Sequence, residues 1–278
     1  MMFRRSLAGG AFLALVAFSA QAHFQILFTE DLSRVRGKPT TLTMAFSHPV
    51  YGGPDMDMGE PLAFYVLSQR GDEGEVKRTD LAEFLEKVTW SGIKNESVGY
   101  RATLPRNLTR SMGDYVFVLE AAPYYEAEED KYIQQFTRTI LNVGGVPGNW
   151  AEVQNLPAEI QPLSKPYANW TGGLFRGIVL SEGKPVPFAE IEIEYLNYDI
   201  DESKPGFEPG AHVELPHPSY GNLSLRAGAD GEFSVALPRA GWWGICALDV
   251  GPVKTHEGKP LSQDAVLWLE AKDVGAAD

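Results

Sequence analysis

The sequence contains little of what small exported proteins and many enzymes depend on. Its 278 residues include one cysteine, Cys246, and five histidines. A single thiol excludes a disulfide within the chain, so the fold must rest on a hydrophobic core, which a chain of this length can form. Cys246 lies in the apolar run GWWGICALDV, and we expect a buried, unreactive thiol there.

Known catalytic motifs and an excess of positive charge are also missing. The sequence has no G-x-S-x-G turn, no H-E-x-x-H pair and no phosphate-binding P-loop, and we expect the protein not to be an enzyme. Against 37 Asp and Glu there are 24 Lys and Arg, which gives a net charge of −13. This balance argues against nucleic acid or an anionic membrane as a partner. One acidic run, EAEED at 126–130, is expected to be a solvated surface.

Only one long apolar run is present, and it lies near the N-terminus. Two arginines precede the apolar stretch 7–20, and AQA at 20–22 supplies the small residues of a signal-peptidase site. The run is shorter than the ~20 residues of a membrane-spanning helix. We therefore predict a signal peptide at residues 1–22, cleaved after Ala22, and a periplasmic protein that begins at His23 and does not span the membrane. The paired arginines leave twin-arginine export open beside the general secretory route.

The remaining sequence is typical of β-structure. Short alternating or apolar runs, rich in β-branched and aromatic residues, recur between turn residues, as in a β-sandwich. These runs cover residues 40–47, 62–68, 115–122, 135–143, 174–181, 189–197, 232–238, 242–250 and 265–272. One segment, DLAEFLEKV at 80–88, has apolar residues at helical spacing behind an aspartate and predicts a single helix.

A proline-rich stretch without a clear period, residues 151–172, divides the chain. We predict two β-sandwich domains, immunoglobulin-like or transthyretin-like, at 23–150 and 173–278, joined by this linker. In the second half, alternate glutamates from Glu190 to Glu194 predict a strand with one buried and one solvated face. This half resembles carboxypeptidase-regulatory and transthyretin-like modules, which are structural or binding units rather than enzymes.

His23 would be the first residue of the exported protein. A terminal histidine offers its α-amine and its ring Nδ1 to one metal ion in a six-membered chelate. The reference pKa is ~7.7–8.0 for the amine and ~6.5 for the imidazole, so protons compete little with a metal at neutral pH. Nitrogen donors favour Ni²⁺, Co²⁺, Cu²⁺ and Zn²⁺ over Mg²⁺ and Ca²⁺. The alternative is a surface histidine exposed by chance.

A second group of donors follows the strand expected at 40–47. There, FSHPVYGGPDMDMGEP presents His48 and a loop with the alternating donors Asp55, Met56, Asp57 and Met58. Imidazole, carboxylate and thioether groups on one loop can supply metal ligands. Turn formation by the aspartates and packing by the methionines are the alternatives.

The expected strand pairing would bring the two histidines together. If HFQILF pairs with 40–47 as an antiparallel hairpin, the start of the first strand lies beside the end of the second, at the open end of the hairpin. We therefore predict His23 and His48 as metal ligands, with Asp57 or Met58 nearby. His256, in a turn before the last strand, is an outside candidate.

Several segments together resemble a family of exported proteins encoded beside bacterial nickel/cobalt uptake transporters. They are AHFQILF, SHPVYGGPDMDMGEP, YIQQFTRTILNV, IQPLSKPYANWTGGLFRGIVLSEGKPVPFAEIEIEYLN, ADGEFSVALPRAGWWGICAL and HEGKPLSQDAVLWLE. The resemblance implies a periplasmic component, without catalytic activity, that binds Ni²⁺ or Co²⁺ and hands it to the membrane components of a transporter.

Two other functions stay open. Copper-dependent polysaccharide monooxygenases also mature to an N-terminal histidine and add a second histidine from a β-sandwich, as His23 with His48 or His256 would. A structural or adhesive two-sandwich protein would bind metals no better than exposed carboxylates do. The metal itself also stays open, because the affinity order of divalent ions favours Cu²⁺ at nitrogen sites.

Overall fold

The structure, a computed structural model, describes residues 23–71 and 74–275, so the predicted signal peptide lies outside the described residues. Within these ranges the strands form sheets of four, twelve and four strands. The helical segments there are three short 3-10 turns, at Ala82–Phe84, Arg106–Leu108 and Pro218–Tyr220. The predicted all-β sandwich class is therefore confirmed. In this described part, no helix is long and apolar enough to cross a membrane.

The first sheet contains the predicted hairpin. Its strand order is β1 (Phe24–Phe28), β3 (Thr40–Ser47), β7 (Glu96–Leu104) and β6 (Leu85–Ser91). Strands β1 and β3 are antiparallel, with Phe24 opposite Ser47. The pairing expected for HFQILF and TTLTMAFS is confirmed, and it leaves His23 and His48 at one edge of the sheet.

The large sheet runs through both halves of the chain. Its main path joins β16 (Leu223–Arg226), β15 (Glu190–Tyr195), β18 (Gly241–Ala247), β20 (Lys259–Lys272), β10 (Lys131–Val143), β8 (Gly113–Glu120), β4 (Ala63–Gln69) and β5 (Lys77–Asp80). Four short strands pair at its margins: β2 (Ser33–Arg34), β9 (Tyr124–Glu126), β12 (Asn169–Trp170) and β19 (Thr255–His256).

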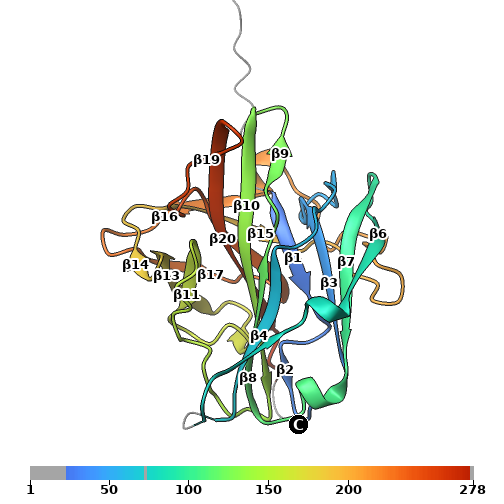
Figure 1. Ribbon diagram of the computed structural model, residues 1–278. Helices are drawn as coiled ribbons and strands as arrows, with labels where there is room; N and C mark the ends of the chain where they lie inside the picture. The colour runs from blue at the N-terminus through green and yellow to red at the C-terminus, as the bar shows by residue number, and fades with distance from the viewer. Residues whose placement is uncertain (1–22, 72–73, 276–278) are drawn as a thin grey trace, which may run out of the picture.

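Strands β10 and β20 join the two halves at the centre of the molecule. They pair in parallel from Tyr132 opposite Leu261 to Thr139 opposite Trp268, and lie side by side in Figure 1. The third sheet consists of β11 (Glu159–Pro162), β13 (Leu174–Ser181), β14 (Lys184–Pro185) and β17 (Glu232–Ala236). The segment predicted as a linker, 151–172, contains β11 and β12. The division into two domains stays a prediction.

Strand β8 shows how the large sheet becomes buried on both faces. Its side chains alternate between two hydrophobic clusters: Val116 packs in the one that includes Phe175 of β13, and Phe117 in the one that includes Met44 of β3. A strand covered on both faces is apolar throughout, which explains the unbroken run YVFVL at 115–119.

The helix predicted over 80–88 is wrong. The aspartate does begin a turn, because the Asp80 carboxylate accepts a hydrogen bond of 2.8 Å from the Ala82 N–H. The turn ends at Phe84, and the chain continues as β6, paired with β7. At the end of β6 Trp90 is fully buried and donates to Asp55 Oδ1 at 3.0 Å. This tertiary contact outweighs the local helical spacing.

The solvated face predicted for the glutamates of β15 is also wrong. Only Glu190 is exposed, whereas Glu192 and Glu194 are buried. The loop that follows β3 contacts Glu194, because the Val50 N–H donates to Glu194 Oε2 at 3.3 Å. Burial raises the pKa of Glu194 well above its usual range. Cys246 is fully buried, as expected, and burial raises the pKa of its thiol.

Candidate metal site

His23 and His48 lie next to each other at the edge of the first sheet. Because β1 begins directly after His23 and β3 ends directly before His48, the antiparallel register places both at the same point. Their ring centroids are 4.5 Å apart, with 42° between the ring planes. The predicted proximity of the two rings is confirmed. Their role as metal ligands stays a prediction.

The His23 ring is held in a mostly apolar environment. Its side chain is 13% exposed, and its ring centroid lies 5.4 Å from that of Phe46 and 6.2 Å from that of Tyr124. Burial lowers the pKa of His23 to about 4, with Glu129 opposing this shift and Lys131 adding to it. The ring is therefore neutral at pH 7 and keeps one nitrogen lone pair.

Glu126 decides which nitrogen keeps that lone pair. His23 Nε2 lies 3.2 Å from Glu126 Oε2. Since the neutral ring has one N–H, the carboxylate favours the proton on Nε2, which leaves Nδ1 as the acceptor. If the chain is cleaved before His23 as predicted, Nδ1 is the atom that would chelate a metal together with the new α-amine. A carboxylate that orients a histidine in this way is common beside metal ions.

The acidic run at 126–130 was expected to be solvated, and Glu126 departs from that expectation because it faces His23. Strand β9 pairs with β10, so Tyr124 and Glu126 point to the side of His23, while Tyr125 points to the other side. Sequence reasoning missed this residue because its place depends on the register of a distant strand pair.

Asp57 and Met58 line a small pocket together with Phe46 and Tyr124, the two rings that pack on His23. Gln25 lines the same pocket. Met58 is buried, and its Sδ accepts a hydrogen bond of 3.4 Å from Gln25 Nε2. Asp57 Oδ1 accepts one of 2.8 Å from the N–H of Val98 in β7. Both side chains therefore already serve the local structure.

The other candidates have structural roles or lie elsewhere. Asp55 is buried against Trp90, and Met56 pairs through its main chain with Phe46. The ring of His256 packs edge-on against Tyr132, with centroids 4.7 Å apart. Tyr132 is paired with Tyr125, which points away from the His23 side of β9. The structure does not bring His256 to the two histidines.

Gln135 of β10 holds the start of β1 in place. Its Nε2 donates to the His23 carbonyl oxygen at 2.6 Å, and its Oε1 accepts from the Gln25 N–H at 2.6 Å. The same Nε2 lies 3.3 Å from Asp264 Oδ2. These contacts fix the main chain on which His23 stands, so the ring position is set by the sheet rather than by a loose terminus.

The side chains alone do not complete a metal site. Across residues 23–71 and 74–275, no group of three or more His, Cys, Asp or Glu side chains is placed to hold one ion. His23 and His48 would contribute two ring nitrogens to such a site. A third nitrogen at the same point would be the α-amine that cleavage before His23 creates. The donor set fits a transition metal only with that amine included.

The neutral state of His23 has a consequence for stability. An unfolded histidine takes up a proton as the pH falls through 6.5, whereas folded His23 does so only near 4. Protons therefore favour the unfolded state in this window, and His23 is expected to lower the free energy of unfolding by up to about 3 kcal/mol as the pH falls. Urea unfolding of the metal-free protein across this range should show that loss relative to His23→Gln. If the free energy of unfolding falls equally in both proteins over this pH range, the His23 ring is not buried and neutral.

Comparison with known proteins identifies a family whose function is not described. Residues 20–251 match the family described as Domain of unknown function (DUF4198). No curated protein matches the chain.

Similar solved structures include the D0-D1 domain of intimin (10% identity, 87% of this chain and 96% of that chain, TM-score 0.22). The Yersinia pseudotuberculosis adhesin InvE is similar at 11% identity, over 87% of this chain and 58% of that chain, with a TM-score of 0.23. Trypsin-activated alpha-2-macroglobulin from Escherichia coli shares 10% identity over 90% of this chain and 16% of that chain, with a TM-score of 0.20. Likeness at this level carries no argument about function.

Proposed function

The chain belongs to the DUF4198 family, and we propose that it is a periplasmic accessory protein that binds one divalent transition-metal ion between His23 and His48. The observation that carries this proposal is the pair of imidazole rings, 4.5 Å apart, at the predicted mature terminus. The ion would be cargo rather than a catalytic cofactor.

The donor set explains why a free ion would bind there at neutral pH. The His23 ring is neutral because burial lowers its pKa to about 4, so no ring proton has to leave. Glu126 favours the Nε2–H tautomer, which leaves Nδ1 and the α-amine as a chelating pair. The His48 ring supplies the third nitrogen. Zinc, as one example, binds ring nitrogens at ~2.0–2.1 Å, so small rotations of adjacent rings suffice.

We assign Ni²⁺ or Co²⁺ as the cargo, with delivery to the membrane components of a nickel/cobalt transporter. Nitrogen donors suit both ions. The resemblance of the sequence to exported partners of such transporters favours them over Cu²⁺, which any site of this kind also binds. Met58 and Asp57, in the adjoining pocket, would be the nearest further donors during transfer.

The packing around the His23 ring favours transport over copper-dependent oxidation. An enzyme that oxidises a polymer presents its metal on an open surface, where a long chain can lie across it. Here Phe46 and Tyr124 pack on His23, so a small ion has easier access than a polysaccharide.

Titration of Ni²⁺ into protein that begins at His23 tests the shared site. Removing one of three nitrogens by His48→Ala is expected to weaken binding by about 100-fold. His256→Ala is the matched control, because that ring packs on Tyr132 away from the site, and it should leave the affinity unchanged. If His48→Ala binds Ni²⁺ as tightly as the unmodified protein, a site between the two rings is wrong.

A further inference from the structure

Strand β9 makes different contacts on its two faces. Tyr124 and Glu126 point to the side of His23, where the Tyr124 ring packs and Glu126 Oε2 lies 3.2 Å from His23 Nε2. Tyr125, between them, points to the opposite side. There it contacts the start of β20, just after the turn that joins β19 to β20, at the same end of the molecule in Figure 1. One short strand therefore connects the proposed metal site to a second surface turn.

Lys259, the first residue of β20, holds β9 from that opposite side. Its Nζ lies 4.7 Å from the ring centroid of Tyr125, donates to the Tyr125 hydroxyl at 2.9 Å, and forms an ion pair with Asp130 in the turn after β9. The Tyr125 hydroxyl donates to the same Asp130 carboxylate. We call these three residues, Tyr125, Asp130 and Lys259, the latch. It connects two turns that are far apart in the sequence.

Tyr132 of β10 adds two contacts beside the latch. It lies opposite Tyr125 in the strand pairing, and the two ring centroids are 5.2 Å apart. Its hydroxyl donates to Glu257 Oε2 at 2.6 Å, and its ring packs against His256. His256 therefore helps to hold the two turns together, although it lies away from the histidines of the metal site.

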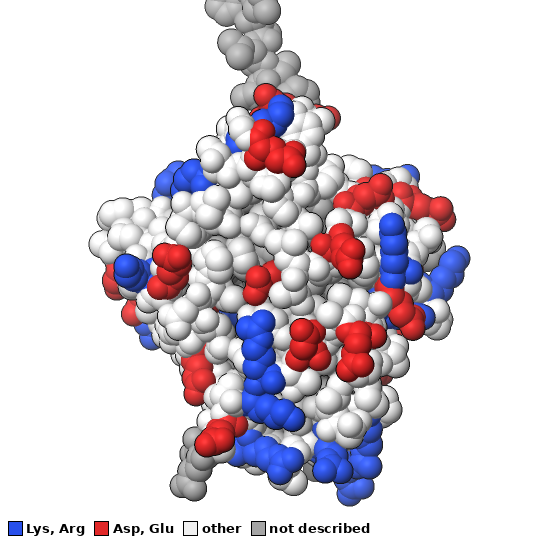
Figure 2. Space-filling view, in the orientation of Figure 1, with Lys and Arg blue, Asp and Glu red and all other residues white. Residues whose placement is uncertain are grey.

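The latch sets the position of β9 because this strand has few other supports. It has three residues, and among the described strands it pairs with β10 alone. A two-stranded hairpin is marginally stable by itself. The latch lies at the surface, with the side chain of Lys259 39% exposed and that of Asp130 72% exposed. On the face drawn in Figure 2, acidic and basic side chains lie together at this end of the molecule. Such a contact can open while the rest of the sheet stays intact.

We propose that the turn between β9 and β10 clamps the His23 ring while the latch is closed, and that opening of the latch releases the bound metal ion. When the turn moves away, Glu126 no longer holds Nε2–H, and the His23 ring can rotate away from the ion. Groups that orient a metal ligand typically contribute roughly 10- to 100-fold to metal affinity. The regulated site is the metal site proposed above, on which this inference rests.

The test measures Ni²⁺ release from protein that begins at His23, by stopped-flow mixing with an excess of chelator. Tyr125→Leu removes the ring and the hydroxyl from the latch without changing the charge, and Lys259→Met removes the ion pair. Each variant should release Ni²⁺ about fivefold faster than the unmodified protein and bind it more weakly. Lys259→Arg keeps the charge over the ring and should release Ni²⁺ at the unmodified rate.

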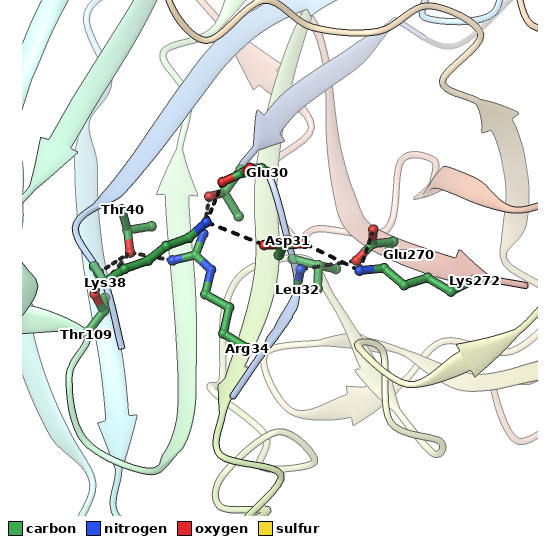
Figure 3. A network of polar contacts seen from close by, with 10 residues as sticks. Glu30, Asp31, Leu32, Arg34, Lys38, Thr40, Thr109, Glu270 and Lys272 are labelled. Carbon is green, nitrogen blue, oxygen red and sulfur yellow. Dashed lines mark hydrogen bonds and ion pairs between the residues drawn. The ribbon is translucent and has the colours of Figure 1, made fainter. Parts of the chain in front are cut away.

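Lys272→Met is the matched control, because Lys272 is the last residue of the same strand. Figure 3 shows its contacts with Asp31, at 3.4 Å, and with Glu270, at 3.3 Å, at the opposite end of β20 from the latch. The substitution removes ion pairs of the same kind and should leave the release rate unchanged. If release speeds up equally in this control, general loss of stability explains the latch variants and the clamp is wrong.

Tyr125→Leu also separates the clamp from simple electrostatics. Loss of the Lys259 charge alone would make this end of the protein more negative, attract Ni²⁺ more strongly and slow its release. Unchanged or slower release in Tyr125→Leu, which alters no charge, would therefore overturn the clamp. So would equal hydrogen exchange at the β9 amides of the metal-free latch variants and the unmodified protein, because the turn would then not open more often. If the unmodified protein itself fails to bind Ni²⁺, the proposed function is wrong and the clamp with it.

Discussion

Protein that carries one additional alanine before His23 is expected to bind Ni²⁺ on the order of 1000-fold more weakly than protein that begins at His23. The extra residue turns the α-amine into a peptide nitrogen, which no longer offers a lone pair, and the six-membered chelate with Nδ1 is lost. A four-ligand structural zinc site contributes about 10–16 kcal/mol, or roughly 2.5–4 kcal/mol for each ligand. Calorimetric titration of both forms measures the difference directly.

The same extension on the His48→Ala background supplies the control. If the amine and the His48 ring hold the same ion, the second change costs little once the first has destroyed the site, and the two effects do not add. Both forms should unfold alike without metal, because the added residue precedes the sheet. If the extended and unextended proteins bind Ni²⁺ with equal affinity, the α-amine is not a ligand. The proposed site of three nitrogens is then wrong.

The hairpin that positions the histidines could be predicted from sequence because it is local. HFQILF and TTLTMAFS each read as a strand, and two neighbouring antiparallel strands bring His23 and His48 to one edge whatever the rest of the chain does. The donor residues of the loop that follows, Asp55 to Met58, could also be recognised from the sequence. Their hydrogen bonds to Trp90, Val98 and Gln25 could not be predicted, because those partners come from other strands.

The environments of Glu126 and of the buried glutamates of β15 could not be predicted from local sequence patterns. Alternation in β15 separates its two faces correctly, but it does not say that the loop at Val50 contacts Glu194. The acidic run at Glu126 looks solvated because four of its five residues are charged. Only the pairing of β9 with β10 turns Glu126 toward His23. Both errors concern what covers a strand, which depends on contacts between distant segments.

The pairing of β10 with β20 was invisible for the same reason. Strand β10 is also joined to β11 of the third sheet by a buried ion pair. Arg138 of β10 and Glu159 of β11 are both buried, with Nη1 and Oε1 2.8 Å apart. The guanidinium also donates to the Ile160 carbonyl oxygen, and Glu159 accepts from the Gln154 N–H. A buried ion pair depends on both partners, since each charge is stabilised by the other.

Glu159→Gln is therefore expected to lower the free energy of unfolding by about 3–5 kcal/mol. The amide has nearly the same shape as the carboxylate, so the loss reflects the buried guanidinium of Arg138 left without a countercharge. Denaturant unfolding of both proteins measures the change. The exposed pair Arg176 and Glu232, 2.7 Å apart, is the matched control. Glu232→Gln should cost at most about 1 kcal/mol, because water screens that pair.

The double variant Arg138→Met/Glu159→Gln separates lost charge balance from lost packing. Methionine fills much of the space of the arginine side chain without its charge, so the double variant should be more stable than Glu159→Gln alone. Because β10 and β20 place both halves in one sheet, each variant should unfold in a single transition whose midpoint shifts as a whole. A second transition that Glu159→Gln leaves untouched would mean that the halves unfold separately despite their shared sheet. Equal stability of Glu159→Gln and the unmodified protein would mean that water or another group already balances the Arg138 charge.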